Sequence, residues 1–453
     1  MRAKTQQIWA RSSSVFLLVI LYYWIGYELD RSQFWLLFSL YSLAFGLSIY
    51  LYKSGLQLKY LIVLSFLFKF IFLVSIPELS QDFYRFIWDG MLNNLGLNPY
   101  LHLPVELIER DTVSNEPIST ILFENMGKLS ATNYSTYPPI AQLIYSFGYS
   151  IAGESLLFNV LFIRLVHICA EVGLVYFGLK ILKKIKRSKK QILFFILNPL
   201  VILESSFNLH FEVIMLFFLA LGLYYLSSSK IYTSALGWAA AVASKMLPLM
   251  FLPLLFSFFN KKAAFFTKGQ VLRYIKFIGV FVLAVVLTYS FLWDSDLFAK
   301  NSKTLALYFT SFEFNASVYY VFRWAGYQWS GYNMISLFGK ILSLGSLLFI
   351  LFLSLRHRKT DFKTLLKYML LVSTVYYLFS TTIHPWYLML PLFLSIFTNY
   401  KYMLLWSWLV FLSYSAYRTT GTEENTLLIA TEYLLLISFV GYEMFFKKAS
   451  LKN

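Results

Sequence analysis

The sequence contains a single cysteine, Cys169, among 453 residues, so no disulfide can form within the chain. Charged residues are also scarce, at 13%, whereas about a quarter of the residues in an average soluble domain are charged. Such a composition excludes an ordinary soluble globular domain and a disulfide-stabilised secreted module.

Several motifs that identify common enzyme classes are missing. The chain has no P-loop, no GxSxG sequence, no HExxH sequence and no cluster with the spacing of a zinc site. No segment has the composition of a soluble nucleotide-binding domain. We therefore expect no metal ion and no other cofactor.

Apolar residues dominate instead. They make up 58% of the chain, aromatic residues make up 20%, and several apolar runs approach the ~20 residues that cross a membrane. The N-terminus lacks a cleavage-site pattern, so the first run is expected to be a retained span. We predict an all-α, polytopic transmembrane protein, a single integral membrane domain over residues 1–453. About 12 spans are expected, near residues 14–28, 34–52, 58–76, 156–182, 190–207, 211–228, 271–293, 333–355, 363–381, 385–398, 402–417 and 426–446.

The net charge of +17 arises from lysines and arginines in short loops such as 183–190 and 356–359. This distribution is typical of cytoplasmic loops that face anionic lipids, and it argues against a nucleic-acid partner. Both termini are basic and are expected in the cytoplasm. Most acidic residues then fall on the opposite, extracytoplasmic side, which also holds the two longest loops, about 77–155 and 294–332.

Two segments depart from the regular alternation of spans. Residues 235–258 are long enough for one span, but the basic loop after them must be cytoplasmic. We predict two half-helices that turn near Ser244 and Lys245, with Pro248 at the start of the second. Residues 138–153 are expected to be interfacial or re-entrant.

A polar stripe interrupts the aromatic stretch QDFYRFIWDGMLNNLGLNPY at residues 81–100. On a helix, Asp82, Arg85 and Asp89 share one face. The stripe fits either an interfacial helix with an ion pair or a carboxylate that acts as a general base.

Lys245 would lie at membrane depth, where a lysine costs roughly 2.5–3.5 kcal/mol on insertion scales. It either contacts an anion such as a lipid phosphate or pairs with a buried carboxylate, Glu171 or Glu204. Arg164 and Glu171, seven residues apart in one span, are expected to form an ion pair.

Further polar and aromatic candidates cluster at the predicted outer ends of spans and in the outer loops. Each could instead be an ordinary interfacial residue. They are Tyr137, Asn208, His210, Glu212, Asn315, His384, Trp386 and Tyr387.

The pattern D-x-Y-R-x-x-W-D-G…G-x-N-P-Y, from Asp82 to Tyr100, resembles membrane glycosyltransferases of the GT-C class. The likeness is greatest to bacterial polyprenyl-phosphate-mannose-dependent mannosyltransferases, the glycosyltransferase family 87 type. Other short matches follow in the expected order along most of the chain, at Tyr137-Pro138-Pro139, Asn208/His210, Ser244-Lys245…Pro248 and His384-Pro385-Trp386-Tyr387. Glu212 departs from the pattern, which usually has Asp there.

This resemblance implies an inverting transfer of a hexose, expected to be mannose, at the outer face of the cell (inner) membrane. The donor would be a polyprenyl-phosphate sugar, and the acceptor a cell-envelope glycan or glycolipid hydroxyl. Asp82 would be the general base, while Arg85, Lys245 and His384 would stabilise the departing phosphate. The remaining candidates, Asp89 included, would bind sugar or line the cleft.

Two other functions fit parts of the pattern. A transporter or flippase for lipid-linked oligosaccharides would use Lys245 and the histidines along its path, but such proteins often carry a matching broken helix in each half. This chain has one. A surface-polysaccharide polymerase would differ mainly in its acceptor.

Overall fold

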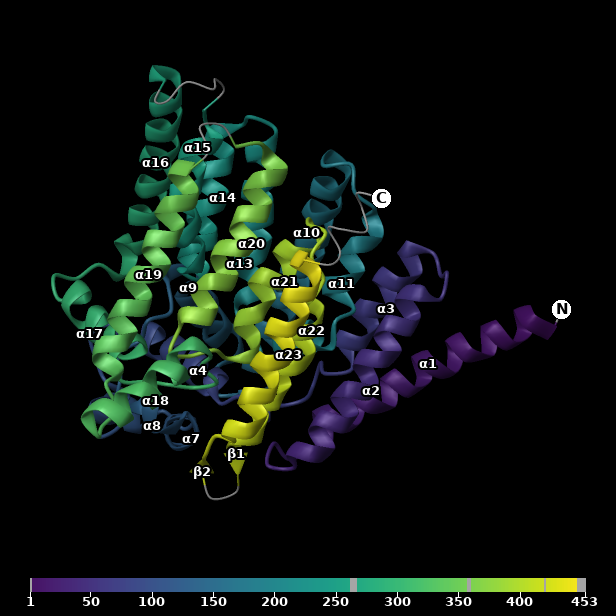
Figure 1. The fold of residues 1–453 in the computed structure, drawn as a ribbon. Helices are drawn as coiled ribbons and strands as arrows, with labels where there is room; N and C mark the ends of the chain where they lie inside the picture. Colours follow the sequence, from purple (N-terminus) through teal and green to yellow (C-terminus); the bar gives the residue numbers. More distant parts are fainter. Residues whose placement is uncertain (1, 261–266, 357–359, 419–420, 446–453) are drawn as a thin grey trace.

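The computed structural model describes residues 2–260, 267–356, 360–418 and 421–445 (Figure 1). Nearly all of this part of the chain is helical. Its strands are β1 (Tyr417–Arg418) and β2 (Gly421–Thr422), which form one small antiparallel hairpin. The predicted all-α class is confirmed.

Six helices in the described residues are long and apolar enough to cross a membrane, which confirms a polytopic membrane protein. They are α1 (Arg2–Tyr27), α2 (Phe34–Lys53), α10 (Leu156–Lys184), α16 (Lys268–Tyr289), α19 (Ile335–Arg356) and α23 (Thr426–Phe445).

Shorter or interrupted helices occupy the other predicted span positions, so half of the twelve are single helices of crossing length. One pair of segments bends by 59° at Asn198-Pro199, because proline has no N–H to continue the helix and Asn198 caps the next turn. These elements are α3 (Leu58–Phe70), η1 (Lys189–Ile192), α11 (Leu193–Ile196), α12 (Pro199–Ile202), η2 (Leu203–Phe207), α13 (Glu212–Ser227), α20 (Phe362–Phe379), η5 (Pro385–Leu388), α21 (Met389–Ser395), α22 (Tyr402–Leu409) and η6 (Val410–Ala416). The predicted pair of half-helices between the spans corresponds to α14 (Ile231–Ser244), η3 (Leu247–Phe251) and α15 (Leu252–Phe258).

The predicted break within residues 235–258 is confirmed. Helix α14 ends at Ser244, Lys245 is extended with φ −161° and ψ 132°, and Pro248 lies at the start of η3. Helix α14 packs closely on α13, where a Cβ on Gly237 would come within 2.8 Å of the Gly222 Cα atom. Small residues at such a contact let two helix backbones approach in a membrane.

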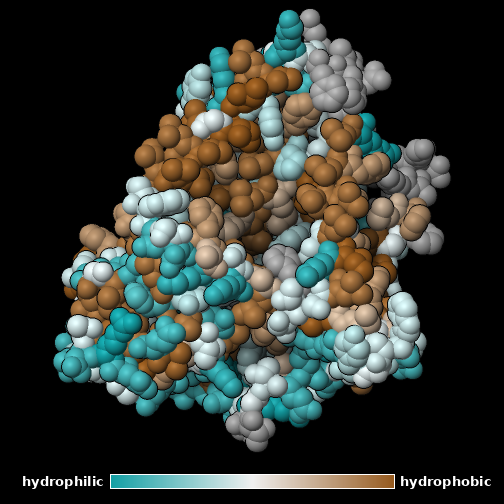
Figure 2. Space-filling view, turned by 90° about the vertical axis from the view of Figure 1, so that its left-hand side faces the viewer, coloured by the Kyte–Doolittle hydropathy of each residue, from teal (hydrophilic) through white to brown (hydrophobic). Residues whose placement is uncertain are grey.

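A layer of short helices covers one end of the bundle. Figure 1 shows α4, α7, α8, α17 and α18 at the same end as the β1–β2 hairpin, and Figure 2 shows hydrophilic side chains gathered there below a largely hydrophobic body. Residues 139–152, expected to be interfacial or re-entrant, form a 14-residue helix in this layer. The layer comprises α4 (Asp82–Asn94), α5 (Pro104–Leu107), α6 (Asp111–Ser114), α7 (Ser119–Asn125), α8 (Gly127–Ala131), α9 (Pro139–Ala152), η4 (Ser290–Leu292), α17 (Leu297–Thr310) and α18 (Val318–Ser330).

Two buried basic residues hold the N-terminal helices against α10. The Lys69 ammonium pairs with the Glu171 carboxylate at 2.9 Å, whereas the Arg164 guanidinium donates to the carbonyl oxygens of Leu73 and Ser75 at 2.8 and 2.9 Å. The predicted Arg164–Glu171 ion pair is therefore wrong. Backbone carbonyls left free where α3 ends compete for the guanidinium, and a lysine from another helix reaches the carboxylate.

Candidate active site

Asp82 is the first residue of α4, and its side chain remains 35% exposed. One carboxylate oxygen lies 3.8 Å from His210 Nδ1. Burial among protein atoms raises the pKa of Asp82 to about 6, Lys245 lowers it, and Glu212 raises it further. A carboxylate with this pKa is ionised at neutral pH and is a stronger base than an ordinary aspartate.

The turn that carries His210 has an unusual backbone. It follows the π-helical segment η2, and Leu209 adopts a left-handed conformation with φ +64°, which is uncommon for a residue that is not glycine. The His210 N–H then donates to the Glu204 carbonyl oxygen at 2.9 Å. This wide turn directs the imidazole of His210 between two carboxylates, because its Nε2 lies 3.5 Å from a Glu204 carboxylate oxygen.

His210 is neutral in this setting. Burial lowers its pKa well below the ordinary value, and the nearby Lys245, His384 and His167 add to the effect. One ring nitrogen therefore carries a hydrogen and the other is free to accept one. A neutral imidazole between Asp82 and Glu204 can donate a hydrogen bond to one of these groups and accept a proton from the other, so it can pass a proton between them.

Glu204 is a site residue that the sequence did not reveal in this role. Its carboxylate is fully buried and accepts hydrogen bonds from the Tyr414 hydroxyl at 2.8 Å and from Asn208 Nδ2 at 2.9 Å. The spacing of Glu204 and Asn208, four apart near the outer end of an apolar segment, was the available signal. The predicted site residue Asn208 thus supports the carboxylate next to His210.

Lys245 forms an ion pair with Glu212, and not with the two carboxylates considered from the sequence. Glu212 is fully buried, whereas 26% of the Lys245 side chain is exposed. The ammonium also lies 5.3 Å from the ring centroid of Tyr387. The break between α14 and η3 therefore presents a cation that is partly open to a ligand.

Four aromatic rings form a continuous stack beside this cation. His210 stacks on Trp386 with 3.6 Å between ring centroids, Trp386 on His384 with 4.4 Å, and His384 on Phe314 with 4.8 Å. The Phe314 segment is fixed because its backbone pairs with the strand-like residues before His384. The stack joins the two predicted histidine turns into one wall.

His384 is also neutral. Burial lowers its pKa to about 3, with a smaller contribution from Lys245. Its Nδ1 atom is buried and has no hydrogen-bond partner among the described residues. It can therefore offer a hydrogen bond to a ligand, but as a neutral ring it offers no positive charge.

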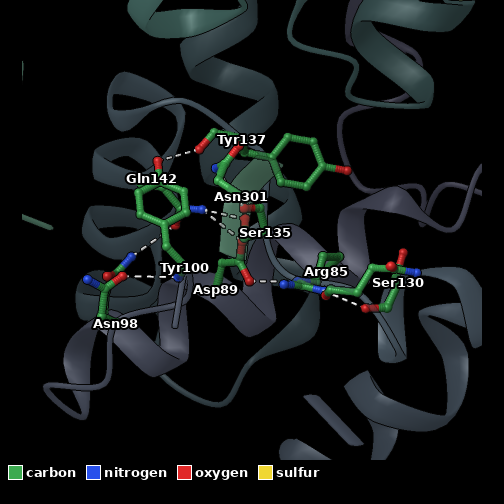
Figure 3. Close-up of polar contacts among 11 residues, drawn as sticks. Arg85, Asp89, Asn98, Tyr100, Ser130, Ser135, Tyr137, Gln142 and Asn301 are labelled. Carbon is green, nitrogen blue, oxygen red and sulfur yellow. Dashed lines mark hydrogen bonds and ion pairs between the residues drawn. The ribbon is translucent and has the colours of Figure 1, made fainter. Parts of the chain in front are cut away.

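Arg85 and Asp89 belong to a different group of contacts from Asp82 (Figure 3). Arg85 Nε lies 2.7 Å from Asp89 Oδ1, and the other oxygen of Asp89 accepts from Gln142 Nε2 at 2.8 Å and from the Ser135 hydroxyl. Both charged side chains are buried. Their bonds attach α4 to α9 and to the segment before it, so the predicted stripe divides into one pocket residue and a buried ion pair.

The end of the sequence motif continues this network. Tyr100 donates its hydroxyl hydrogen to the Tyr137 carbonyl oxygen at 2.6 Å, and Asn98 Nδ2 donates to the Leu292 carbonyl oxygen at 2.8 Å (Figure 3). The Tyr137 ring meets the Phe86 ring edge to face, with centroids 5.0 Å apart. Tyr137 and the Asn-Pro-Tyr sequence thus connect parts of the first long loop with each other and with η4.

Asn315 lies apart from Asp82 in a buried cluster of its own. Its backbone N–H donates to Glu424, and its side-chain amide donates to Glu432 Oε2 at 3.3 Å. Its φ of +46° suits an asparagine, which tolerates this conformation better than most residues. These contacts hold the turn that presents Phe314 to the ring stack.

The described residues contain no group of three or more His, Cys, Asp or Glu side chains that could hold a metal ion. The pocket groups are thus carboxylates, a lysine and neutral histidines beside aromatic rings. This combination can accept a proton from a hydroxyl and stabilise an anion, and it lies in a multi-pass helical membrane protein.

Comparison with known families identifies the class of this membrane protein. Residues 2–260 match the family model described as alpha-(1->6)-mannopyranosyltransferase, N-terminal domain. The chain belongs to this family, and it is a glycosyltransferase that transfers mannose from a sugar donor to a glycan acceptor. No curated protein and no solved structure matches the chain. The suspected resemblance to mannosyltransferases is confirmed.

Proposed function

We propose that the protein transfers mannose from a polyprenyl-phosphate donor to an acceptor hydroxyl at the extracytoplasmic face, as an inverting enzyme of the GT-C class. The observation that carries the proposal is the position of Asp82. Its raised-pKa carboxylate lies beside His210 and within electrostatic reach of Lys245, at the end of the bundle covered by polar helices. A base and a cation in one pocket suit attack by a hydroxyl with departure of a phosphate.

Asp82 accepts the proton of the acceptor hydroxyl in this mechanism. The hydroxyl oxygen forms a bond to the anomeric carbon while the bond from that carbon to the phosphate oxygen breaks. The bonding electrons leave with the polyprenyl phosphate, which gains one negative charge. A single displacement of this kind inverts the anomeric configuration.

Lys245 stabilises the charge that develops on the departing phosphate. Its ion pair with Glu212 fixes the ammonium at the break in the helix, and its exposed quarter leaves room for a phosphate oxygen. His384 donates a hydrogen bond to the same group as a neutral imidazole. The phosphate's negative charge in turn raises the pKa of His384 and favours its protonated form.

His210 orients the Asp82 carboxylate before the reaction. After the reaction, His210 and Glu204 can take up the proton that Asp82 has accepted. The imidazole spans the gap between the two carboxylates, with 3.8 Å on one side and 3.5 Å on the other. Small movements bring these distances into hydrogen-bonding range, as in many sites that tighten when substrate binds.

The orientation rests on charge. The basic loops 183–190 and 356–359 favour the cytoplasm, along with both termini, in the cell (inner) membrane. Asp82, His210 and His384 fall on the opposite side in that arrangement. A donor of this type, made inside, would be flipped across the membrane before use.

A glycosyltransferase is favoured over a transporter because the ionisable pocket groups gather at one end of the bundle. A lipid-linked-oligosaccharide transporter requires polar groups along a path through the membrane. A surface-polysaccharide polymerase shares this chemistry and differs in its acceptor, a cell-envelope glycan or glycolipid in our proposal.

The test is a transfer assay with membranes and radiolabelled polyprenyl-phosphate mannose over a panel of acceptors. Asp82→Asn keeps the size of the side chain and removes the base, so transfer falls by about 10²–10⁴-fold. Asp111→Asn is the matched control, since Asp111 is an exposed aspartate of the same outer loop. Unchanged transfer by Asp82→Asn would refute the role of Asp82, and failure of every polyprenyl-phosphate sugar would refute the donor class.

A further inference from the structure

A cavity of about 370 Å³ opens beside the active site, at the outer ends of the first and last membrane helices. Its size falls within the ~300–1,000 Å³ typical of small-ligand sites. Three separate parts of the chain form it: the end of the α1–α2 turn with the first residues of α2, residues 415–418 that end in β1, and Asn425 with the start of α23. The lining residues are Ser32, Gln33, Phe34, Trp35, Leu36, Ser415, Tyr417, Arg418, Asn425 and Leu428.

The lining combines aromatic rings with hydrogen-bonding groups. Trp35 is 67% exposed, so its indole face is open to a ligand. Gln33 supplies an amide. Asn425 supplies its amide N–H groups, because its oxygen already accepts from the backbone N–H groups of Leu427 and Leu428, and Arg418 supplies the N–H groups that its ion pair with Glu423 leaves over. A hydrocarbon chain in this space would separate these polar groups from water without replacing their hydrogen bonds. A sugar can satisfy them with its hydroxyls while its C–H face packs on the indole.

Tyr417 connects this cavity to the catalytic groups. It lines the cavity, its ring centroid lies 6.1 Å from that of Phe314, and Phe314 begins the stack that ends at His210. The central guanidinium carbon of Arg31 lies 5.0 Å from the centroid of the Tyr417 ring, so a cation faces this ring. Burial raises the pKa of Tyr417, Arg31 lowers it, and Asp82 raises it, in keeping with the closeness of Asp82.

We propose that this cavity is a subsite for the acceptor glycan. It binds a sugar unit of the acceptor next to the one whose hydroxyl is activated by Asp82. The inference rests on the proposed function, and it adds a specificity element: an acceptor with several sugar units binds better than a single sugar. Trp35 and Gln33 are the residues expected to favour an acceptor with several sugar units over a single sugar.

Binding is tested on the full-length protein in detergent with an α-(1→6)-linked mannose trisaccharide as the probe. Titration calorimetry and ligand-observed NMR report binding without any turnover. Trp35→Ala and Gln33→Ala are expected to weaken binding, Trp35→Ala by about tenfold, the scale of a lost aromatic contact. Trp329→Ala is the matched control, because Trp329 is 84% exposed on α18 and lies outside the cavity.

A transfer assay gives a second readout that a general loss of folding would not reproduce. Trp35→Ala raises the KM for the trisaccharide more than the KM for octyl α-mannoside, a single-sugar acceptor. Equal trisaccharide binding by wild type and both variants would overturn the subsite, as would a rise confined to the KM of the donor. Trisaccharide binding that depends on Trp35, in a protein that transfers no mannose from any polyprenyl-phosphate donor, would support the subsite and overturn the proposed function.

Discussion

The imidazole of His210 lies flat on the indole of Trp386, with 3.6 Å between the ring centroids and 14° between the ring planes. This contact fixes the plane of the imidazole, so its two nitrogens point toward Asp82 and Glu204. The orientation of this imidazole is thereby set by ring packing.

Replacing Glu204 tests the importance of this arrangement. Glu204→Gln removes the carboxylate that faces His210 Nε2, and transfer is expected to fall by about 10–100-fold, as for other residues that orient a reacting group. The acid limb of the pH profile of this variant should also move, since glutamine cannot exchange a proton with the imidazole that faces Asp82. The pH profile of kcat/KM is the measurement, and a lower rate with an unmoved limb would indicate a purely structural role.

The pH dependence of the wild type follows from Asp82. The base acts in its ionised form, so with a pKa of about 6 kcat/KM should be level above pH 7 and fall about tenfold per unit well below pH 6. An ordinary aspartate, with a pKa of about 3.9, would place that fall some two units lower. A level profile down to pH 5, in protein that remains folded, would contradict the assignment.

The close contact between α4 and α9 explains why residue 90, in the Trp-Asp-Gly sequence, is a glycine. A Cβ at this position would meet the Tyr145 carbonyl group, with its carbon at 2.7 Å, because α4 and α9 are in close backbone contact. Gly90→Ala should destabilise the protein by about 1–3 kcal/mol through overpacking. Thermal unfolding in detergent measures the effect. Gly279→Ala is the control, since no atom lies within 4 Å of its added Cβ, and equal melting temperatures for both variants would refute the explanation.

The buried pair of Lys69 and Glu171 gives a prediction about stability. Lys69→Met leaves the Glu171 carboxylate unpaired and should cost about 3–5 kcal/mol, whereas the double variant Lys69→Met/Glu171→Leu should recover much of that loss. A double-mutant cycle from thermal unfolding checks this. Additive effects of the two single changes would show that the pair carries no coupling.

Cysteine labelling tests the orientation in the membrane. With Cys169 replaced by serine, Lys189→Cys should react from the cytoplasmic side and Glu106→Cys from the outside, because basic short loops remain inside. Both positions are exposed. A membrane-impermeant maleimide on intact cells gives the readout, and labelling of position 189 from outside would invert the proposed topology.

Much of the site could be predicted from the sequence because charge at membrane depth is rare. Asp82, His210, Lys245 and His384 stand out against apolar surroundings, and the parity of the spans placed the break at Lys245. The structure brings these four residues together. The sequence linked Asp82, His210 and His384 because the order of the spans placed all three on the same side of the membrane.

Other parts depended on the tertiary arrangement. Helical spacing placed Arg85 and Asp89 on the face of Asp82, but it could not show that their part of α4 turns toward Gln142 and Ser135. Glu204 was hidden because a carboxylate in an apolar run is equally compatible with several partners. The π-helical turn and the ring stack arise from contacts between distant segments, which no local pattern records.

The break that exposes Lys245 has a consequence for how the molecule is assembled. Every pocket group lies at an end or interruption of a helix: Asp82 at the start of α4, His210 after η2, Lys245 after α14 and His384 before η5. Such interrupted backbone is tolerated at membrane depth only within surrounding protein. The long helices must therefore enclose these segments before the pocket can exist, which makes catalytic competence a late event in biogenesis.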